Sequence, residues 1–127
     1  MSDRTIGILG LGIFGSSVLT ALAKQDMNII AIDDHAEHIN QFEPVLARGV
    51  VGDITDEELL RTAGIDTCDT VVVATGENLE SSVLAVMHCK SLGVPRVIAK
   101  VKSQTAKKVL EKIGADSVIS PEYEMGQ

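Results

Sequence analysis

Apolar residues are arranged along the chain in two alternating patterns. Short runs rich in β-branched residues are typical of strands buried on both faces of a sheet, and they occupy residues 5–9, 29–32, 45–51, 71–74, 97–101 and 118–119. Between these runs, apolar residues recur every three or four positions, as on one face of a helix; examples are Phe14, Val18 and Leu22, and Ala106, Val109, Leu110 and Ile113. Strands that alternate with helices indicate βαβ units with right-handed crossovers. The sequence therefore predicts an α/β fold with a doubly wound, parallel, six-stranded sheet and helices on both faces.

Turn-forming residues mark the ends of the predicted helices. Gly93 and Pro95 end the fourth helix, Gly114 ends the fifth, and Thr55 caps the third, with Glu58 as its capping-box partner three residues later. No linker, repeat or low-complexity segment interrupts the pattern. We therefore expect residues 1–127 to form one domain.

A glycine motif lies between the first predicted strand and the first predicted helix. The stretch "GILGLGIFGSSV", residues 7–18, fits G-x-G-x-x-G with Gly10, Gly12 and Gly15. In this setting the first glycine permits a tight turn, the second leaves room for a pyrophosphate, and the third lets the helix lie close to the strand. The free N–H groups at the start of the helix then face the anion. The motif predicts a nucleotide site in a Rossmann-type fold.

A carboxylate completes the fingerprint at the end of the second strand. In "IIAIDD", residues 29–34, Asp33 is placed to accept hydrogen bonds from both ribose hydroxyls of an adenosine and to repel a 2′-phosphate. This favours NAD, ATP or ADP over NADP. Asp34 is the competing candidate, but its side chain points the opposite way if the strand continues through it.

Two further loops end at the same edge of the predicted sheet, where ligands bind in open α/β folds. "VVGDITDEE" brings Asp53 near the expected adenine position, either as a ligand contact or as a turn residue at a helix start. "VVVATGEN" brings Thr75 and Gly76 to this edge.

Charge and composition exclude several other classes. The chain has 11 basic and 18 acidic residues and a net charge of -7, which opposes binding to a nucleic-acid backbone. No apolar run approaches the ~20 residues of a membrane span, and "MSDRT" lacks the start of a signal peptide, so we expect a cytoplasmic protein without direct membrane insertion. Cys68 and Cys89 are expected to be reduced. The His88–Cys89 pair and the His35/His38 pair lack third and fourth metal ligands at a recognised spacing and are interpreted as exposed helix residues.

These motifs together are similar to one known family. "GILGLGIFGSSV", "AIDD", "VVGDITDEELLRTAGIDTCDTVVVATGEN" and, most specifically, "KVLEKIGADSVISPEYEMG" resemble the N-terminal nucleotide-binding half of an RCK domain, also called KTN or TrkA-N, across essentially the whole chain. The resemblance is greatest to regulatory subunits of Trk/Ktr-type potassium uptake systems. It implies a cytoplasmic homodimer that assembles into an octameric ring beneath a membrane potassium-translocating subunit and converts nucleotide binding into gating.

The resemblance also implies roles for individual residues, matched motif by motif. It places the phosphates on Gly10, Gly12 and Gly15, the ribose on Asp33, the adenine edge at Asp53 and Ile54, and the opposite wall at Thr75, Gly76 and Asn78. Lys100 either aims its ammonium at the phosphates or is a solvated lysine at a strand end.

One departure concerns the ligand. Members that respond to ATP and ADP often have Arg followed by Phe after the second glycine, whereas this chain has Ile13 before Phe14. Isoleucine offers a terminal phosphate only apolar contact, so NAD(H) competes with ATP/ADP as the expected cofactor.

The C-terminal segment carries a candidate metal ligand and part of the expected interface. In "SVISPEYE", Glu122 follows Pro121, and two copies of this carboxylate in a dimer would hold Mg²⁺ or Ca²⁺; the alternative is a solvated loop glutamate. Leu79, Val83 and Met87 are expected to face the core, so self-association would use other positions. Members of the family continue past "EMG" into a second lobe, which is absent here, so the chain is expected to be an excised domain or to lack that lobe.

Two alternatives to potassium regulation are an NAD(H)-binding redox sensor and the cofactor domain of a dehydrogenase. A dehydrogenase needs a proton donor or acceptor beside the hydride-transfer site. No His/Asp or Lys/Tyr constellation of this kind is evident in the sequence. We therefore expect a protein that binds a nucleotide without being an enzyme.

Overall fold

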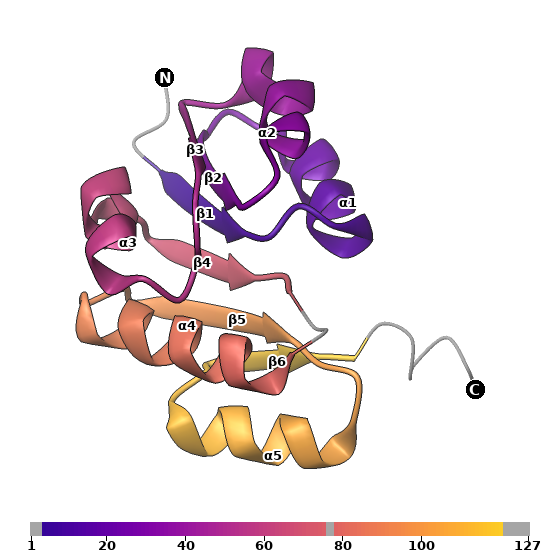
Figure 1. Cartoon of the computed structure of the whole chain (residues 1–127), viewed down its shortest axis with the longest axis vertical. Coiled ribbons are helices and arrows are strands. Elements are labelled where there is room, and N and C mark those ends of the chain that lie inside the picture. The colour runs from indigo at the N-terminus through magenta and orange to yellow at the C-terminus, as the bar shows by residue number, and fades with distance from the viewer. Residues whose placement is uncertain (1–3, 76–77, 121–127) are drawn as a thin grey trace.

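A computed structural model describes residues 4–75 and 78–120. Its centre is a six-stranded, all-parallel sheet with the strand order β3-β2-β1-β4-β5-β6 (Figure 1). The strands are β1 (Thr5–Leu9), β2 (Asn28–Asp33), β3 (Arg48–Val51), β4 (Thr70–Val73), β5 (Arg96–Lys100) and β6 (Ser117–Ile119). The expected doubly wound parallel sheet is confirmed.

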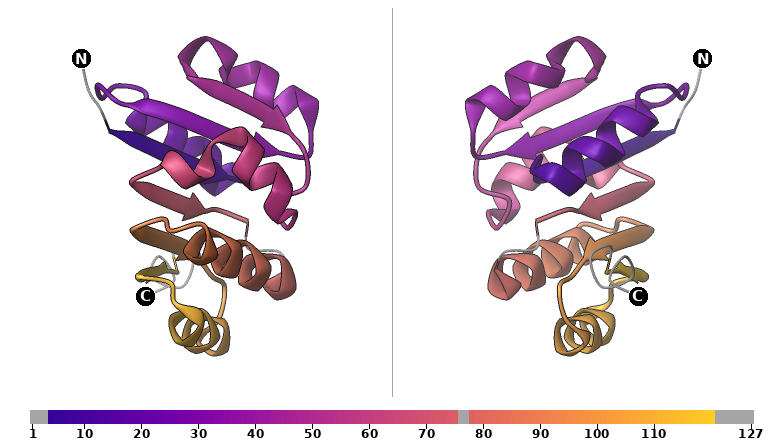
Figure 2. Two further views of the ribbon diagram at one scale, coloured as in Figure 1. Left: turned by 90° about the vertical axis from the view of Figure 1, so that its left-hand side faces the viewer. Right: turned by 90° about the vertical axis from the view of Figure 1, so that its right-hand side faces the viewer.

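Helices cover both faces of this sheet. They are α1 (Ile13–Leu22), α2 (Ala36–Phe42), α3 (Glu57–Ala63), α4 (Leu79–Ser91) and α5 (Gln104–Ile113), with short 3₁₀ helices at η1 (Glu43–Val45) and η2 (Ile65–Thr67). Buried side chains place α1 and α2 on one face and α3, α4 and α5 on the other. Figure 2 shows α3 nearest the viewer from one side and α1 from the other.

The alternation of side chains along the central strands builds two separate cores. In β1, Ile8 belongs to the core under α1 and α2, whereas Leu9 belongs to the core under α3, α4 and α5. In β4, Val72 faces the first core and its neighbours Val71 and Val73 face the second. A strand with both faces covered needs apolar residues at successive positions, which explains the continuous runs in the sequence.

The edge strand β3 differs from its prediction. The run at residues 45–51 is apolar, but β3 begins only at Arg48, because Pro44 stands in the first turn of the preceding 3₁₀ helix. β3 pairs with β2 alone, and most of its residues are exposed. Burial on both faces is therefore wrong for this strand. As the edge strand of the sheet, β3 has a hydrogen-bonded neighbouring strand, β2, on one side only.

The start of α3 is also corrected. Its N-cap is Asp56, whose carboxylate accepts hydrogen bonds from the N–H groups of Glu58 and Leu59 at 3.1 and 3.4 Å. Thr55 instead donates its hydroxyl to Asp53 at 2.7 Å. Because the two candidate caps are adjacent, the capping pattern alone did not separate them. The predicted helix ends are confirmed: α4 ends at Ser91 and α5 at Ile113, before Gly93 and Gly114 respectively.

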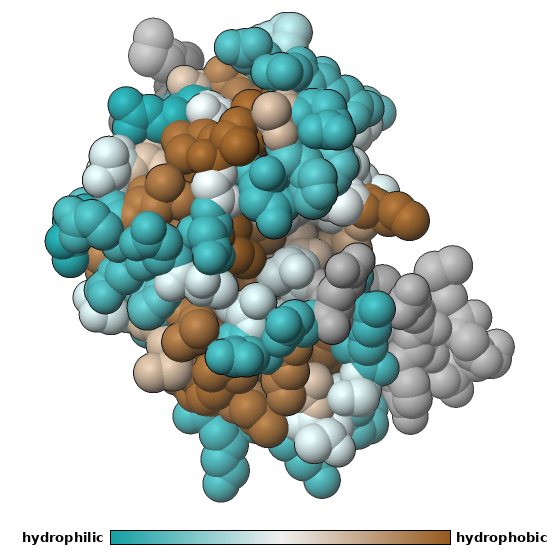
Figure 3. Space-filling model, viewed as in Figure 1, coloured by the Kyte–Doolittle hydropathy of each residue, from teal (hydrophilic) through white to brown (hydrophobic). Residues whose placement is uncertain are grey.

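Part of α4 faces outward. Leu79 and Met87 are 41% and 49% exposed, so the expectation that both face the core is wrong, whereas Val83 packs partly against it. Apolar side chains gather over α4 and α5 in Figure 3. The other helix face carries Val86 and Cys89, which are fully buried.

Both cysteines are free thiols in the core under α3, α4 and α5. Burial is the main cause that raises the pKa of Cys68 and of Cys89 to about 12, and Asp69 and Asp66 add to the effect at Cys68. Thiols with so high a pKa are protonated and unreactive at neutral pH. The structure therefore gives the cysteines a packing role.

We expect Asp56→Ala to lower the free energy of unfolding by about 0.5–2 kcal/mol, the usual cost of removing an N-cap side chain. Urea unfolding followed by circular dichroism measures the change. Thr55→Ala is the matched control, since it leaves both hydrogen bonds from Asp56 to the helix in place. A larger loss in Thr55→Ala than in Asp56→Ala would show that Thr55 is the cap after all.

Candidate functional site

A cleft lies at the carboxyl edge of the sheet, where the strand order changes direction. The described residues that line it come from the ends of β1 to β4 and from the start of α4: Gly10, Asp33, Asp34, Gly52, Asp53, Ile54, Thr75 and Ser81. β1 leads to β2 and β3 on one side, and β4 begins the other half of the sheet. Such a switch point leaves a crevice between the connections, and it is where open α/β sheets bind ligands.

The glycine loop between β1 and α1 is folded against the end of β4. Gly10 has a φ of +100°, a conformation that side-chain-bearing residues rarely adopt, and its N–H donates to the carbonyl of Ile32 at 2.8 Å. A Cβ atom on Gly15 would overlap the carbonyl oxygen of Gly10. A Cβ on Gly12 would meet nothing within 4 Å. Two of the glycines are therefore demanded by packing, whereas Gly12 borders open space.

The N-terminus of α1 differs from those of the other described helices. It has neither a side-chain hydrogen bond at its N-cap, Gly12, nor an acidic residue in its first turn. The helices α3, α4 and α5 are capped by Asp56, Asn78 and Ser103, and α2 carries Glu37 in its first turn. First-turn N–H groups have no acceptor within a helix, and they lie at the positive end of its dipole. This end of α1 is suited to an anion.

Asp33 joins the end of β2 to the glycine loop. It is 6% exposed, and its Oδ2 accepts a hydrogen bond from the N–H of Leu11 at 2.6 Å while Oδ1 accepts from the N–H of His35 at 2.8 Å. Burial raises the pKa of Asp33, but these two backbone hydrogen bonds and the nearby His38 outweigh that effect, and the net pKa lies below its usual value. Asp33 is therefore an ionised acceptor at the wall of the cleft.

Two more carboxylates border the cleft. β2 ends at Asp33, so strand alternation does not extend to Asp34, which also lines the cleft and lies 2.7 Å from Nδ1 of His35. Asp53 accepts hydrogen bonds from the N–H and hydroxyl of Thr55 at 2.9 and 2.7 Å, and these bonds lower its pKa. Asp53 is thus a turn residue and a cleft residue at once.

The opposite wall is formed in part by residues that the sequence indicated. Thr75 lines the cleft on this wall, as does Ser81 in the first turn of α4, which no sequence motif indicated; Ile54 lines the cleft beside Asp53, at the expected adenine edge. Asn78 is not among the lining residues; its Oδ1 caps α4 by accepting from the N–H groups of Glu80 and Ser81. Gly76 and Glu122 lie outside the described residues.

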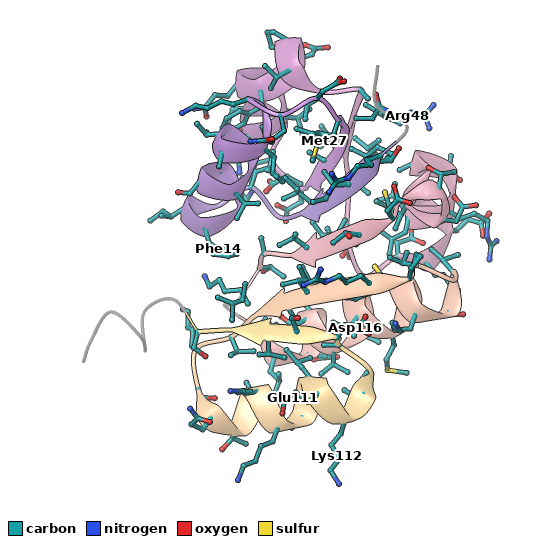
Figure 4. The ribbon with its side chains drawn as sticks, turned by 180° about the vertical axis from the view of Figure 1, so that it is seen from behind. Phe14, Met27, Arg48, Glu111, Lys112 and Asp116 are labelled. Atoms are coloured by element: carbon teal, nitrogen blue, oxygen red, sulfur yellow. The ribbon has the colours of Figure 1, made fainter. Side chains whose placement is uncertain are left out.

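Three candidate residues lie beside the cleft without lining it. Ile13 is the first residue of α1 and is 92% exposed. Phe14 follows it, at the end of α1 seen in Figure 4, and packs partly against the core. The Nζ of Lys100 lies 5.9 Å from the centre of the Phe14 ring. A cation above an aromatic face is attracted by the ring, so Phe14 holds this lysine near the start of α1.

The three histidines make hydrogen-bond contacts that their spacing in the sequence did not predict. His35 is the N-cap of α2 and His38 lies in its first turn, and both rings turn toward the Asp33 carboxylate. The preceding strand therefore places beside both rings a carboxylate that the spacing of the histidines did not indicate. His88 is not a simple exposed residue either, because its Nε2 donates to the carbonyl of Thr55 at 2.9 Å.

Comparison with known proteins identifies the family. The family model described as the TrkA-N domain matches residues 6–121. The chain belongs to the TrkA-N family. It is 36% identical over 124 residues to Ktr system potassium uptake protein C of Bacillus subtilis, and 32% identical over 124 residues to Ktr system potassium uptake protein A of Vibrio alginolyticus. In both cases the match covers 98% of this chain and 56% of the relative, so the TrkA-N domain spans little more than half of these proteins.

Solved structures show the same fold. The TrkA-N domain of the inner membrane protein YbaL from Escherichia coli has a TM-score of 0.87 at 17% identity, covering 99% of this chain and 93% of that one. The GsuK channel bound to NAD has a TM-score of 0.82 at 18% identity, covering 98% of this chain and 23% of that one. Across residues 4–75 and 78–120, this TrkA-N domain has no helix with the length and apolar character of a membrane span.

The glycine loop of the TrkA-N domain yields a paired prediction. Gly15→Ala places a methyl group against the Gly10 carbonyl and is expected to lower the free energy of unfolding by about 1–3 kcal/mol, the usual cost of overpacking. Gly12→Ala enters open space and is expected to unfold like the wild type. Chemical denaturation of the two variants tests the assignment, and equal stabilities would contradict it.

Proposed function

We propose that this TrkA-N domain binds an adenine nucleotide in the cleft, with the phosphates on the first turn of α1 and the ribose on Asp33. The observation that carries this proposal is the buried, ionised carboxylate of Asp33 in the switch-point cleft, with the uncapped N-terminus of α1 two residues beyond the cleft residue Gly10. The first group favours anions and the second accepts hydrogen bonds from hydroxyl groups. A nucleotide carries both chemistries on one molecule.

The hydrogen bonds of Asp33 leave it able to hold a ribose. Each carboxylate oxygen offers two lone pairs. Oδ1 accepts from the N–H of His35 and contacts the His38 ring, whereas on Oδ2 the N–H of Leu11 uses one lone pair and leaves the other for a ribose hydroxyl. The same bond fixes the orientation of the carboxylate, so little freedom is lost when a ligand binds. An ionised Asp33, with Asp34 and Asp53 nearby, repels a 2′-phosphate, which supports NAD or ADP rather than NADP. Ile54 then offers an apolar surface to the adenine.

The start of α1 favours NAD(H) over ATP as the tighter ligand. Ile13 has no donor for a terminal phosphate, and Lys100 is held over the Phe14 ring. The described residues enclose about 150 Å³, less than the ~300–1,000 Å³ of pockets that enclose a whole ligand, so a dinucleotide would extend beyond the cleft along α1. Solved structures of the same fold include GsuK channels bound to NAD and to ADP, which supports adenine nucleotides as the ligand class.

The relatives support a regulatory role for this binding. Both Ktr proteins are potassium uptake proteins, and their match to this chain spans its nucleotide cleft. In our proposal the domain is the regulatory part of a potassium uptake system, and its nucleotide controls transport by a membrane potassium-translocating partner. Control requires only that the ligand bind one of two conformations more tightly than the other. Chemistry on the nucleotide is not part of the proposal.

Self-association completes the regulatory proposal. Leu79 and Met87 expose an apolar stretch of α4, which a second copy could cover in the proposed dimer or octameric ring. We also propose that Glu122 holds a divalent cation at the subunit interface, because two copies of one carboxylate repel each other unless a cation lies between them. Solution scattering of the whole protein tests the assembly, and a strictly monomeric mass at micromolar concentration would exclude the ring.

Nucleotide binding is tested by calorimetry with NAD⁺, ADP, ATP and NADP⁺. We expect binding of NAD⁺ with weaker binding of NADP⁺, and a loss of about 5- to 150-fold for Asp33→Ala, equivalent to about 1–3 kcal/mol. Gly12→Ala is expected to weaken binding without loss of stability, because its methyl group occupies the space reserved for the phosphates. Asp66→Ala, which removes an exposed carboxylate at the opposite edge of the sheet, is the matched control. Unchanged affinities in Asp33→Ala and Gly12→Ala would place the ligand elsewhere.

The regulatory role is tested by potassium uptake in cells that depend on the whole protein and its membrane partner. Gly12→Ala is expected to shift the uptake rate, whereas Asp66→Ala keeps it. In parallel, incubation of the purified domain with NADH or ATP is expected to leave both intact. Steady consumption of either nucleotide would instead support the enzyme alternative.

A further inference from the structure

A second set of groups converges on Asp33 from the side of α2. Oδ1 of Asp33 lies 3.0 Å from Nδ1 of His38 and 3.3 Å from Nδ1 of His35. These three atoms all lie within 4.8 Å of one another. The geometry arises because β2 ends at Asp33 and α2 begins three residues later, at Ala36, which places the ring of its N-cap and a first-turn ring on the same side of one carboxylate.

The separations suit a metal ion that prefers nitrogen and oxygen ligands together. Zinc bonds of about 2.0–2.2 Å in tetrahedral geometry place neighbouring ligand atoms about 3.3 Å apart. The two Asp33–histidine distances, 3.3 and 3.0 Å, lie close to this value. Two imidazoles and one carboxylate suit zinc and similar transition metals, whereas Mg²⁺ and Ca²⁺ prefer oxygen ligands throughout.

The cluster of Asp33, His35 and His38 combines a carboxylate fixed by hydrogen bonds with histidine rings that solvent can reach. The Asp33 carboxylate is buried and held by the N–H groups of Leu11 and His35, so it is already oriented. The side chains of His35 and His38 are 59% and 36% exposed, which leaves an approach for the ion and positions for water. Oδ1 of Asp34 lies 2.7 Å from Nδ1 of His35 and adds negative charge beside the site.

We propose that Asp33, His35 and His38 bind a divalent transition metal ion of the zinc class. The ion shares the Asp33 carboxylate with the ribose of the proposed nucleotide, and this second step rests on the proposed function. Leu11 already occupies one lone pair of Oδ2, and the ion takes the oxygen that faces the histidines. An ion on Oδ1 draws negative charge from the whole carboxylate and makes Oδ2 a poorer acceptor for a ribose hydroxyl. Metal binding therefore weakens nucleotide binding, and by linkage the nucleotide weakens metal binding to the same degree.

The metal site is tested first without any nucleotide. The protein carries no affinity tag, and a chelator used to strip bound metal is removed before the measurement. Calorimetry with Zn²⁺ and the visible absorption of Co²⁺ are expected to show one ion for each chain. His38→Gln and His35→Gln are each expected to lower Zn²⁺ affinity by more than about tenfold. His88→Gln is the matched control, because it alters the third histidine of the chain and leaves the Asp33 cluster intact. Excess Mg²⁺ is expected not to displace Co²⁺.

Equal Zn²⁺ affinity in the wild type and His38→Gln would overturn the site, as would absence of Zn²⁺ binding. These variants alter exposed or half-exposed side chains, and circular dichroism checks that they are folded.

The coupling is tested by measuring NAD⁺ affinity with and without saturating Zn²⁺. We expect Zn²⁺ to weaken NAD⁺ binding at least severalfold in the wild type and to have no effect in His38→Gln, whose altered side chain does not line the cleft. An unchanged NAD⁺ affinity in zinc-loaded wild type would overturn the shared-ligand proposal. A protein that binds Zn²⁺ but none of NAD⁺, ADP and ATP would overturn the proposed function and leave the metal site standing.

Discussion

The hydrogen bond from the N–H of Leu11 to the Asp33 carboxylate connects the parts of this domain that bear on function. It joins the turn after β1 to the end of β2, beside the hydrogen bond from the N–H of Gly10 to the carbonyl of Ile32. By holding the glycine loop and the carboxylate in one geometry, it defines the wall of the cleft. The same bond orients the carboxylate oxygen that faces the two histidines. A single buried acid thus serves the loop, the cleft and the α2 cluster.

The helix α1 begins without a side-chain cap, which leaves the N–H groups of its first turn without a side-chain acceptor. Elsewhere the chain satisfies helix N-termini with its own side chains, as Asp56, Asn78 and Ser103 show. A capping residue at Gly12 would stabilise α1 but would occupy the donors that an anion needs. The uncapped start of α1 is therefore less stable but is free to bind an anion. The close packing of Gly15 on Gly10 keeps α1 in place.

Charge is distributed unevenly around the cleft. Asp33, Asp34 and Asp53 border it on the side of β2 and β3, whereas the N-cap of α1, at the positive end of the helix dipole, lies two residues beyond the cleft residue Gly10. A ligand with hydroxyl groups at one end and phosphates at the other matches this polarity in only one orientation. The same cluster of carboxylates can accept hydrogen bonds from hydroxyl groups in the cleft and, beside α2, can attract a cation.

The sequence by itself determined the order and type of the elements and the chemistry of the glycine loop. Continuous apolar runs and helical periodicity are local consequences of burial, so they are readable without contacts, and the G-x-G-x-x-G spacing encodes a local turn. Only the tertiary structure decided that β3 lies at an edge, that Leu79 and Met87 face outward, and that both histidines of α2 meet Asp33. These features depend on which elements become neighbours and on the direction in which the chain leaves a strand, and no spacing between residues along the sequence specifies either.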